Sequence, residues 1–164
     1  MQLDDVIADL MRTSGDRLLR LAYQLCHDRP AAEDLVQEAL TRVYGSWLRR
    51  APSVDNREAY VPRAVVNEYL RRRRLRSATE LVTDALPETG GADFDRAVVE
   101  RDELWQALAE LSARQRAVLV LLYYEDLPDR EIALIVGAKE ATVRSLALRG
   151  LELLRANRRI EERS

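Results

Sequence analysis

The arginine run in VVNEYLRRRRLR, residues 65–76, is the first feature of the sequence that could do chemistry. Residues 61–76 carry six arginines against Glu68, for a local charge of +5, and residues 77–104 that follow carry a local charge of −6. The overall charge of −2 therefore hides a basic segment, and a polyanion responds to that local field. A solvated helix end would show the same run, so other features must decide between the two interpretations.

Catalytic and metal-binding chemistry has little support. Cys26 and His27 are adjacent, but a zinc site needs three or four ligands and the chain has one cysteine and one histidine. The carboxylates of AEDLVQEAL, residues 32–40, have helical spacing on an exposed face, whereas general acid–base catalysis needs a pocket. The sequence also lacks a glycine-rich phosphate loop. We expect no metal, no cofactor and no enzymatic activity.

The composition predicts an all-α protein, and the length allows either a single core or two small domains. Charged residues make up 33% of the 164 residues and aromatic residues 5%, and glycine and proline are scarce apart from a cluster at 87–91. This profile favours helices over strands. A single cysteine rules out an internal disulfide, and the longest apolar stretch, AVLVLLYY at 117–124, is too short to cross a bilayer. We expect a soluble, cytoplasmic protein without membrane insertion.

Hydrophobic periodicity predicts the helices of a first domain, residues 1–76. Apolar residues recur at helical spacing over 3–10, over 18–25, from about 30 to 48, and over 59–74. The third helix, which begins near Asp28 and Pro30, has one apolar face: Leu35, Val36, Ala39, Leu40, Val43, Tyr44 and Trp47. The fourth helix has Val61, Val65, Val66, Tyr69 and Leu70 inward, follows a loop at 49–58 and is expected to end in the arginines.

A flexible acidic linker is predicted over residues 77–94, where helical periodicity is lost and a proline and two glycines occur. A second domain, residues 95–164, follows the linker. Within it, Ser112 and Gln115 have the spacing of a capping box at the start of a helix.

The last part of the sequence has a helix-turn-helix pattern. Two helices, over about 129–136 and 139–155, are joined by a turn at Gly137. The outward side chains of the second helix combine donors for base edges with cations for phosphates, as a helix in a major groove requires: Lys139, Thr142, Arg144, Ser145 and Arg149. A helix pair that serves only stability would leave these arginines solvated.

Three separated segments read AAEDLVQEALTRVYGSW, AYVPRAVVNEYLRRRR and LAELSARQRAVLVLLYYEDLPDREIALIVGAKEATVRS. In this order they resemble a bacterial sigma factor of the extracytoplasmic-function (ECF) class, within the sigma-70 family, and they span nearly the whole chain. The resemblance implies that region 2 binds the clamp helices of the β′ subunit of core RNA polymerase and opens the −10 promoter element. It implies that region 4 reads the −35 element of promoter DNA.

The resemblance also implies roles for single residues. EDLVQEAL matches the polymerase-docking helix, so Asp34, Gln37 and Glu38 are expected to contact the clamp helices. VVNEYLRRRR matches the helix that meets the −10 element, and residues 54–58 before it match a base-capturing loop. The residues expected to contact −10 DNA are Asn56, Arg57, Tyr60, Arg63, Asn67, Arg71, Arg72, Arg73 and Arg74.

Region 4 departs from the family pattern. Pro128 and Lys139 stand at helix starts where relatives commonly carry a small hydroxyl residue, and Leu146 stands where a basic residue is frequent. Leu148 and Leu151 add to an apolar outer face, which could pack on the β flap, on region 2 or on an anti-sigma factor.

Two other functions stay open at this point. A stand-alone helix-turn-helix regulator would bind operator DNA as a dimer, without polymerase. A helical interaction protein would leave the arginine run solvated and would show no salt-dependent affinity for DNA.

Overall fold

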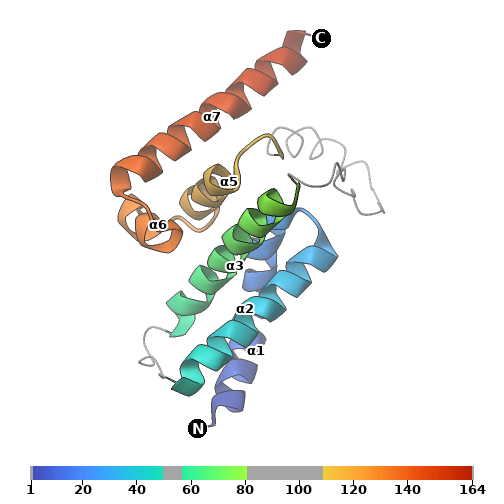
Figure 1. Ribbon diagram of the computed structural model, residues 1–164, viewed down its shortest axis with the longest axis vertical. Helices are drawn as coiled ribbons and strands as arrows, with labels where there is room; N and C mark the ends of the chain where they lie inside the picture. Colours follow the sequence, from blue (N-terminus) through green and yellow to red (C-terminus); the bar gives the residue numbers. More distant parts are fainter. Residues whose placement is uncertain (1, 50–56, 81–108, 164) are drawn as a thin grey trace. The chain divides into compact units, whose positions relative to one another are not determined.

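The computed structural model describes residues 2–49, 57–80 and 109–163, and within them the side chains of all but 57–59, 79–80 and 157–163. Every regular element in these ranges is helical, which confirms the all-α fold (Figure 1). The chain divides into two compact units, Met1–Leu75 and Arg76–Ser164, each described here by itself. Residues 50–56 of the predicted loop at 49–58, and residues 81–94 of the predicted linker, lie outside the described residues, whereas residues 49, 57 and 58 are helical.

Helix α1 (Leu3–Cys26) is continuous, so the prediction of two short helices in its place is wrong. Its buried residues lie on one side of the helix along its whole length: Val6, Leu10, Leu18, Leu21, Ala22 and Leu25. In the polar middle, the Thr13 hydroxyl donates a hydrogen bond to the carbonyl of Asp9 at 2.9 Å, one turn earlier in the helix. The helix ends at His27, whose φ of 51° lies in the left-handed region.

Helix α2 (Arg29–Arg49) begins where the sequence predicts. The carboxylate of Asp28 accepts a hydrogen bond from the backbone N–H of Ala31 at 3.2 Å and so caps the first turn. The short turn between α1 and α2 lets them pack side by side in opposite directions (Figure 1). The predicted apolar face is buried, except that Tyr44 is half-buried.

Helix α3 (Arg57–Glu80) runs through the arginine segment, so the prediction that the arginines end it is wrong. Arginine is a good helix former, so the arginine run itself gives the helix no reason to end. The first four residues of the segment predicted as a linker are therefore helical. Four of the five residues predicted to face inward are buried, and Leu70 is half-buried.

In the second unit, the predicted capping box is present at the start of α5 (Ala113–Leu119). The hydroxyl of Ser112 accepts from the N–H of Gln115 at 3.1 Å, and the Gln115 side chain accepts from the N–H of Ser112 at 3.0 Å. A π-helical turn, η2 (Val120–Tyr124), continues from α5. The predicted single helix over this segment thus changes its hydrogen-bond pattern halfway.

The predicted helix-turn-helix is confirmed by α6 (Asp129–Val136) and α7 (Glu140–Arg163). Gly137 connects them with a φ of 68°, a conformation that glycine adopts without strain. The pair shares a buried core made of Ile132, Ala133, Val136, Val143 and Ala147. Helix α7 is longer than predicted and reaches Arg163.

Helix α7 also packs closely on α5, through Gly150. A Cβ atom at this position would lie 2.8 Å from Cδ1 of Leu119, closer than van der Waals contact allows. Glycine here lets the two helices approach closely, because a larger residue would have to displace the Leu119 side chain; the backbone angle at Gly150 does not call for glycine.

Candidate functional site

Three polar residues on α2 form an outward surface that we call the docking face: Asp34, Gln37 and Glu38. Their spacing of i, i+3 and i+4 places them on one side of the helix. The side chain of Asp34 is 70% exposed, whereas that of Glu38 is partly covered. The face predicted from sequence thus exists as a contiguous polar surface opposite the buried apolar face.

Next to the docking face lies a cluster that the sequence did not lead us to expect, which we call the Glu68 cluster. Glu68 of α3 is only 2% exposed. Arg71 donates to its two carboxylate oxygens at 2.6 and 3.1 Å, and Arg72 Nε lies 3.3 Å from one of them. Arg42 of α2 approaches with Nε at 2.9 Å. A buried carboxylate therefore binds three guanidinium groups.

The hydrogen bond from Arg71 lowers the pKa of the Glu68 carboxyl below its ordinary value. Burial alone would raise this pKa, but the hydrogen bond from Arg72 and the charge of Arg42 lower it further. Glu68 is thus held in its charged form. The signal missed in the sequence is its spacing: Glu68 lies three and four residues before two arginines, on the same side of the helix as buried valines.

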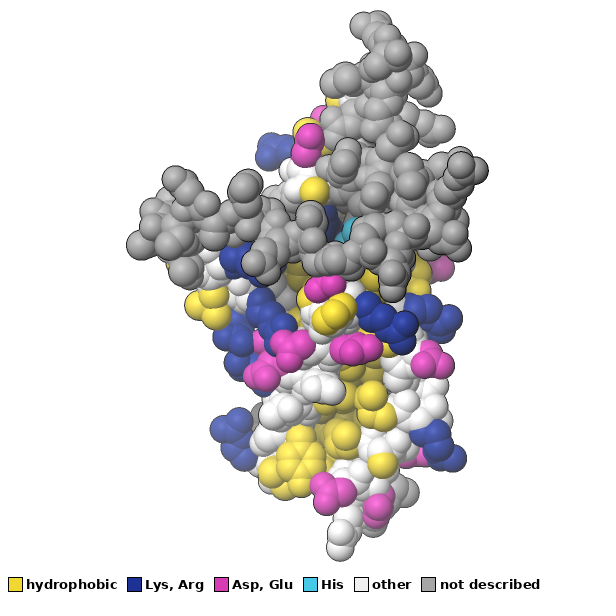
Figure 2. Space-filling view, turned by 90° about the vertical axis from the view of Figure 1, so that its right-hand side faces the viewer, with side chains coloured by type: hydrophobic (Ala, Val, Ile, Leu, Met, Phe, Trp, Pro, Cys, Tyr) yellow, Lys and Arg dark blue, Asp and Glu magenta, His cyan; other side chains and the backbone are white. Residues whose placement is uncertain are grey.

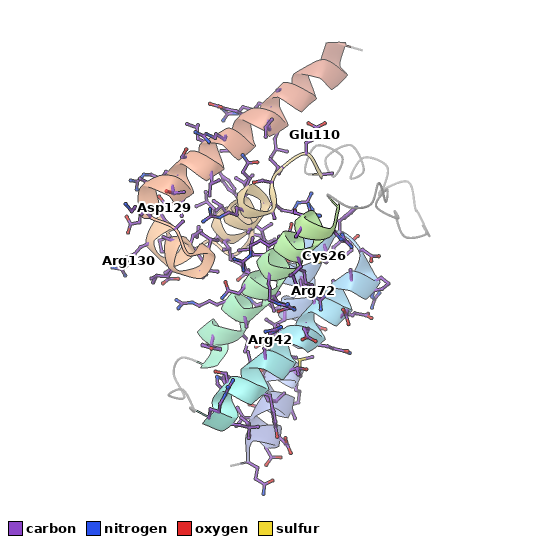
Figure 3. The ribbon with its side chains drawn as sticks, in the orientation of Figure 1. Cys26, Arg42, Arg72, Glu110, Asp129 and Arg130 are labelled. Atoms are coloured by element: carbon purple, nitrogen blue, oxygen red, sulfur yellow. The ribbon has the colours of Figure 1, made fainter. Side chains whose placement is uncertain are left out.

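The Glu68 cluster extends to the docking face through two more ion pairs. Arg72 Nη1 lies 3.0 Å from Asp34 Oδ2, and Arg42 Nε lies 3.7 Å from Glu38 Oε1. Arg42 and Arg72, labelled in Figure 3, lie where α2 and α3 run side by side. Two residues predicted to bind polymerase are therefore in one charge network with two residues predicted to bind DNA.

The remaining predicted −10 residues divide by their position around α3. Tyr60, Arg63, Asn67 and Arg74, which we call the outer stripe, lie within about 60° of one another at 3.6 residues per turn. Among the described residues, no ion pair holds Arg63, Arg73 or Arg74. Asn56 lies outside the described residues, and so does the side chain of Arg57.

One face of the molecule carries charges of both signs. Figure 2 shows Lys and Arg side chains next to Asp and Glu side chains on that face, with a hydrophobic area below them. Of the six arginines counted in the sequence, Arg71 and Arg72 are paired with Glu68, so the six do not carry equally free charge.

An aromatic pair lies at the start of the outer stripe. The rings of Trp47 and Tyr60 are 6.0 Å apart between centroids and tilted by 49°. Tyr60 stays partly exposed, whereas Trp47 is buried, and its indole N–H has no hydrogen-bond partner among the described residues. The tyrosine ring is thus supported from one side and accessible on the other.

The helix-turn-helix presents the predicted −35 residues at the start of α7. Lys139, Thr142, Arg144 and Arg149 are exposed, and Ser145 is half-buried. Pro128 offers no side-chain cap to α6, and its carbonyl accepts from the N–H groups of Glu131 and Ile132 instead. Asp129 and Glu140 are the acidic residues of the two first turns, where the helix dipole favours them.

One of these predicted DNA contacts is near acidic partners. Arg144 Nη1 lies 3.8 Å from Asp129 and 4.0 Å from Glu140, and its side chain is 61% exposed. Exposed pairs of this kind contribute little, about 0–1 kcal/mol, so a phosphate can replace them.

Apolar side chains are exposed on both helices of the motif. Leu134 of α6 and Leu148 of α7 are 69% and 56% exposed, whereas Leu146 and Leu151 are half-buried. The unusually apolar surface predicted for α7 is therefore centred on Leu148, and Leu134 adds a residue that the sequence analysis did not single out.

The residues considered for metal binding do not form a metal site. Cys26 is partly buried, and the ring of its neighbour His27 packs on that of Tyr23 at 5.3 Å between centroids. Within the described ranges, no three histidine, cysteine, aspartate or glutamate residues gather in a way that could hold a metal ion. None of the described helices is long and apolar enough to span a bilayer.

Comparisons with known families agree with this architecture. Sigma-70 region 2 matches residues 10–79, and sigma-70 region 4 matches residues 101–154. The chain is 34% identical over 150 residues to the RNA polymerase sigma-E factor of Streptomyces coelicolor, covering 90% of this chain and 82% of the relative. It is 33% identical over 157 residues to the ECF RNA polymerase sigma factor SigL of Mycobacterium tuberculosis, covering 89% of each. The chain therefore belongs to the sigma-70 family, and its relatives are ECF sigma factors.

A solved structure shares the fold. It is a co-crystal structure of the sigma factor RpoE in complex with the anti-sigma factor NepR from Bartonella quintana, with a TM-score of 0.67 and 22% sequence identity. It covers 96% of this chain and 99% of that chain. The class defined by fold and sequence is thus the two-region sigma factor, a subunit that binds core RNA polymerase and promoter DNA.

Proposed function

We propose that this protein is an initiation factor that binds core RNA polymerase and directs it to promoters through the residues described above. The observation that carries the proposal is the presence of both family regions in order, with the docking face and the outer stripe on neighbouring helices of the first unit. The factor supplies recognition and DNA opening but no catalysis of its own, and it acts in the cytoplasm. The proposed domains are region 2 at 1–76, a linker at 77–94 and region 4 at 95–164.

In the proposed mechanism, the docking face binds the β′ clamp helices. Asp34, Gln37 and Glu38 offer two carboxylates and an amide, which suit basic and hydrogen-bonding side chains on a partner helix. Because this surface is polar and narrow, it orients the complex, while apolar contacts elsewhere supply much of the affinity.

The proposed −10 contact lies on α3. Extruding a base from the DNA stack costs a few kcal/mol, which contacts to the separated strand must repay. The exposed ring of Tyr60 could stack on a base, at about 1–3 kcal/mol per base, while arginines of α3 bind phosphates and Asn67 reaches base edges.

The proposed −35 contact is made by the start of α7. Lys139 directly precedes α7, and the other four residues lie in its first three turns: Thr142, Arg144, Ser145 and Arg149. The N-terminal part of such a helix enters the major groove. The β flap and an anti-sigma factor are candidate partners for the apolar surface that includes Leu134 and Leu148. The structural relative was solved in complex with an anti-sigma factor, which supports this second part of the proposal.

The test is reconstitution with bacterial core RNA polymerase. We expect the purified protein to co-elute with core enzyme and to start transcription from specific sites on a genomic DNA library, which core enzyme alone does not do. A dimer that binds duplex DNA tightly in the absence of polymerase would instead favour the operator-binding regulator. Binding to neither polymerase nor DNA would leave a helical interaction protein.

A further inference from the structure

The charge requirement of Glu68 limits what its neighbouring arginines can do. A carboxylate that is 2% exposed must be neutralised by cations, because an unpaired buried charge is strongly destabilising. Arg71 and Arg72 lie within 3.3 Å of Glu68 in their closest contacts, and Arg42 lies within 2.9 Å. These arginines are therefore already paired with Glu68 in the folded protein.

Position around the helix separates Arg72 from Arg74, whereas Arg71 lies within about 60° of Arg74 and differs from it by its pairing with Glu68. Arg72 and Arg74 point about 160° apart at 3.6 residues per turn, because they are two residues apart. Arg72 lies on the same side of α3 as the buried valines, and its side chain is 34% exposed. Arg74 is exposed and belongs to the outer stripe, together with Arg63 and Asn67. A DNA backbone lying along the outer stripe would contact Arg74 directly, whereas Arg72 would lie on the opposite side of the helix.

We infer that Glu68 is a positioning residue that divides the arginine segment into two functions. Its carboxylate holds Arg71 and Arg72, together with Arg42, as the link between the docking helix and α3, and it leaves Arg63 and Arg74 as the arginines that bind DNA phosphates. This inference rests on the proposed function and revises the sequence-based prediction in which the four consecutive arginines bind DNA alike.

The test is the salt dependence of binding to a fluorescein-labelled, mixed-sequence single strand of 20 nucleotides, measured by anisotropy with the full-length protein. Each phosphate contact contributes about 0.7 to the slope of log K against log salt for single strands. We expect Arg63→Gln and Arg74→Gln each to reduce the slope by about that amount, and Arg72→Gln to leave it unchanged.

The decisive variant is Glu68→Gln, for which the inference predicts a change of the opposite sign. Loss of the carboxylate charge frees Arg71 and Arg72, so the slope should become steeper by roughly 0.7 to 1.4. A residue with only a structural role would weaken DNA binding when replaced. Should Glu68→Gln fail to fold, judged by circular dichroism, the comparison of Arg72→Gln with Arg74→Gln carries the test alone.

The outcomes separate this inference from the proposed function. The division of the arginines would be overturned if Arg72→Gln and Arg74→Gln reduced the slope equally, or if folded Glu68→Gln left the slope unchanged. Either result would leave the proposed DNA binding intact. An unmodified protein without salt-dependent affinity for the strand would overturn the proposed −10 contact itself, and the assignment of Arg63 and Arg74 with it.

Discussion

Asp34 Oδ2 and Arg72 Nη1 lie 3.0 Å apart, so a residue of the docking face is paired with a residue of the arginine segment before any partner binds. The pair is partly exposed and is expected to contribute about 0–1 kcal/mol, which a stronger partner can replace. In the proposed mechanism, polymerase that binds Asp34 competes with Arg72 for one carboxylate. The contact connects the docking face to α3, the helix that carries the outer stripe.

The first prediction concerns polymerase docking. We expect Asp34→Ala to weaken the affinity for core RNA polymerase by about 10- to 100-fold, since a hydrogen bond to a charged group contributes about 1.5–3 kcal/mol. The matched control is Asp16→Ala, an exposed aspartate on α1, a helix that contributes no residue to the docking face. Equal effects of the two variants in a titration of labelled protein with core enzyme would argue against the docking face.

The second prediction concerns the −35 contact. We expect the reconstituted holoenzyme to select duplexes with a preferred sequence from a random pool. Thr142→Ala should relax that preference at single base positions. Arg149→Gln, at an exposed position suited to phosphate, should instead weaken all selected sequences about equally. Glu152→Gln, exposed on the same helix, serves as the control for changes in charge. An unchanged preference in Thr142→Ala would show that α7 does not read bases through this residue.

The third prediction is a pH dependence of stability caused by Glu68. Its pKa is lowered in the folded protein, chiefly by Arg71, whereas a glutamate in an unfolded chain titrates near about pH 4.3. The charged group therefore stabilises the fold above that pH, and this contribution is lost as pH falls through the lower, folded pKa. In urea denaturation, the difference in stability between the unmodified protein and Glu68→Gln should shrink from pH 6 to pH 3.

Glu152→Gln is the control in that experiment because its side chain is exposed. A stability difference for Glu68→Gln that stays constant with pH would mean that the carboxylate charge contributes nothing specific to the cluster.

The fourth prediction compares two glycines within helices. Gly150→Ala should destabilise the protein by roughly 1 kcal/mol, because the overlap with the buried side chain of Leu119 outweighs the gain in helix propensity. Gly45→Ala, where no other atom lies within 4 Å of the new Cβ, should stabilise α2 by about 0.5–1 kcal/mol. Opposite signs of the two changes in chemical denaturation, followed by circular dichroism, would support the packing argument; a stabilising Gly150→Ala would contradict it.

Periodicity was sufficient for the parts of the fold that bury one apolar face. The face of α2 from Leu35 to Trp47, the capping box at Ser112 and the turn at Gly137 could all be predicted, because each depends on local spacing and local chemistry. The −10 and −35 residues remain predictions, since their roles depend on DNA that is absent from the protein alone.

The errors in prediction have two causes. The continuity of α1 and the length of α3 were missed because polar stretches without apolar periodicity were interpreted as turns or helix ends, although polar residues such as arginine form helices well. Glu68 was counted as one opposing charge because the sequence does not show that Arg42, from another helix, would approach it. Long-range pairing of charges is a property of packing and is not encoded in local periodicity.

The π-helical turn after α5 bears on how chains of this kind can change in length. The N–H of Glu125 bonds to the carbonyl of Val120 at 3.1 Å, and that of Leu127 to the carbonyl of Leu121 at 3.0 Å, both spans longer than the four residues of an α-helix. Such a turn holds one residue more than an α-helical turn and leaves the flanking helices in place. We expect a deletion of one residue between Leu119 and Glu125 to be accommodated by a return to α-helical bonding, so that the chain can become shorter here while α6 and α7 keep their structure.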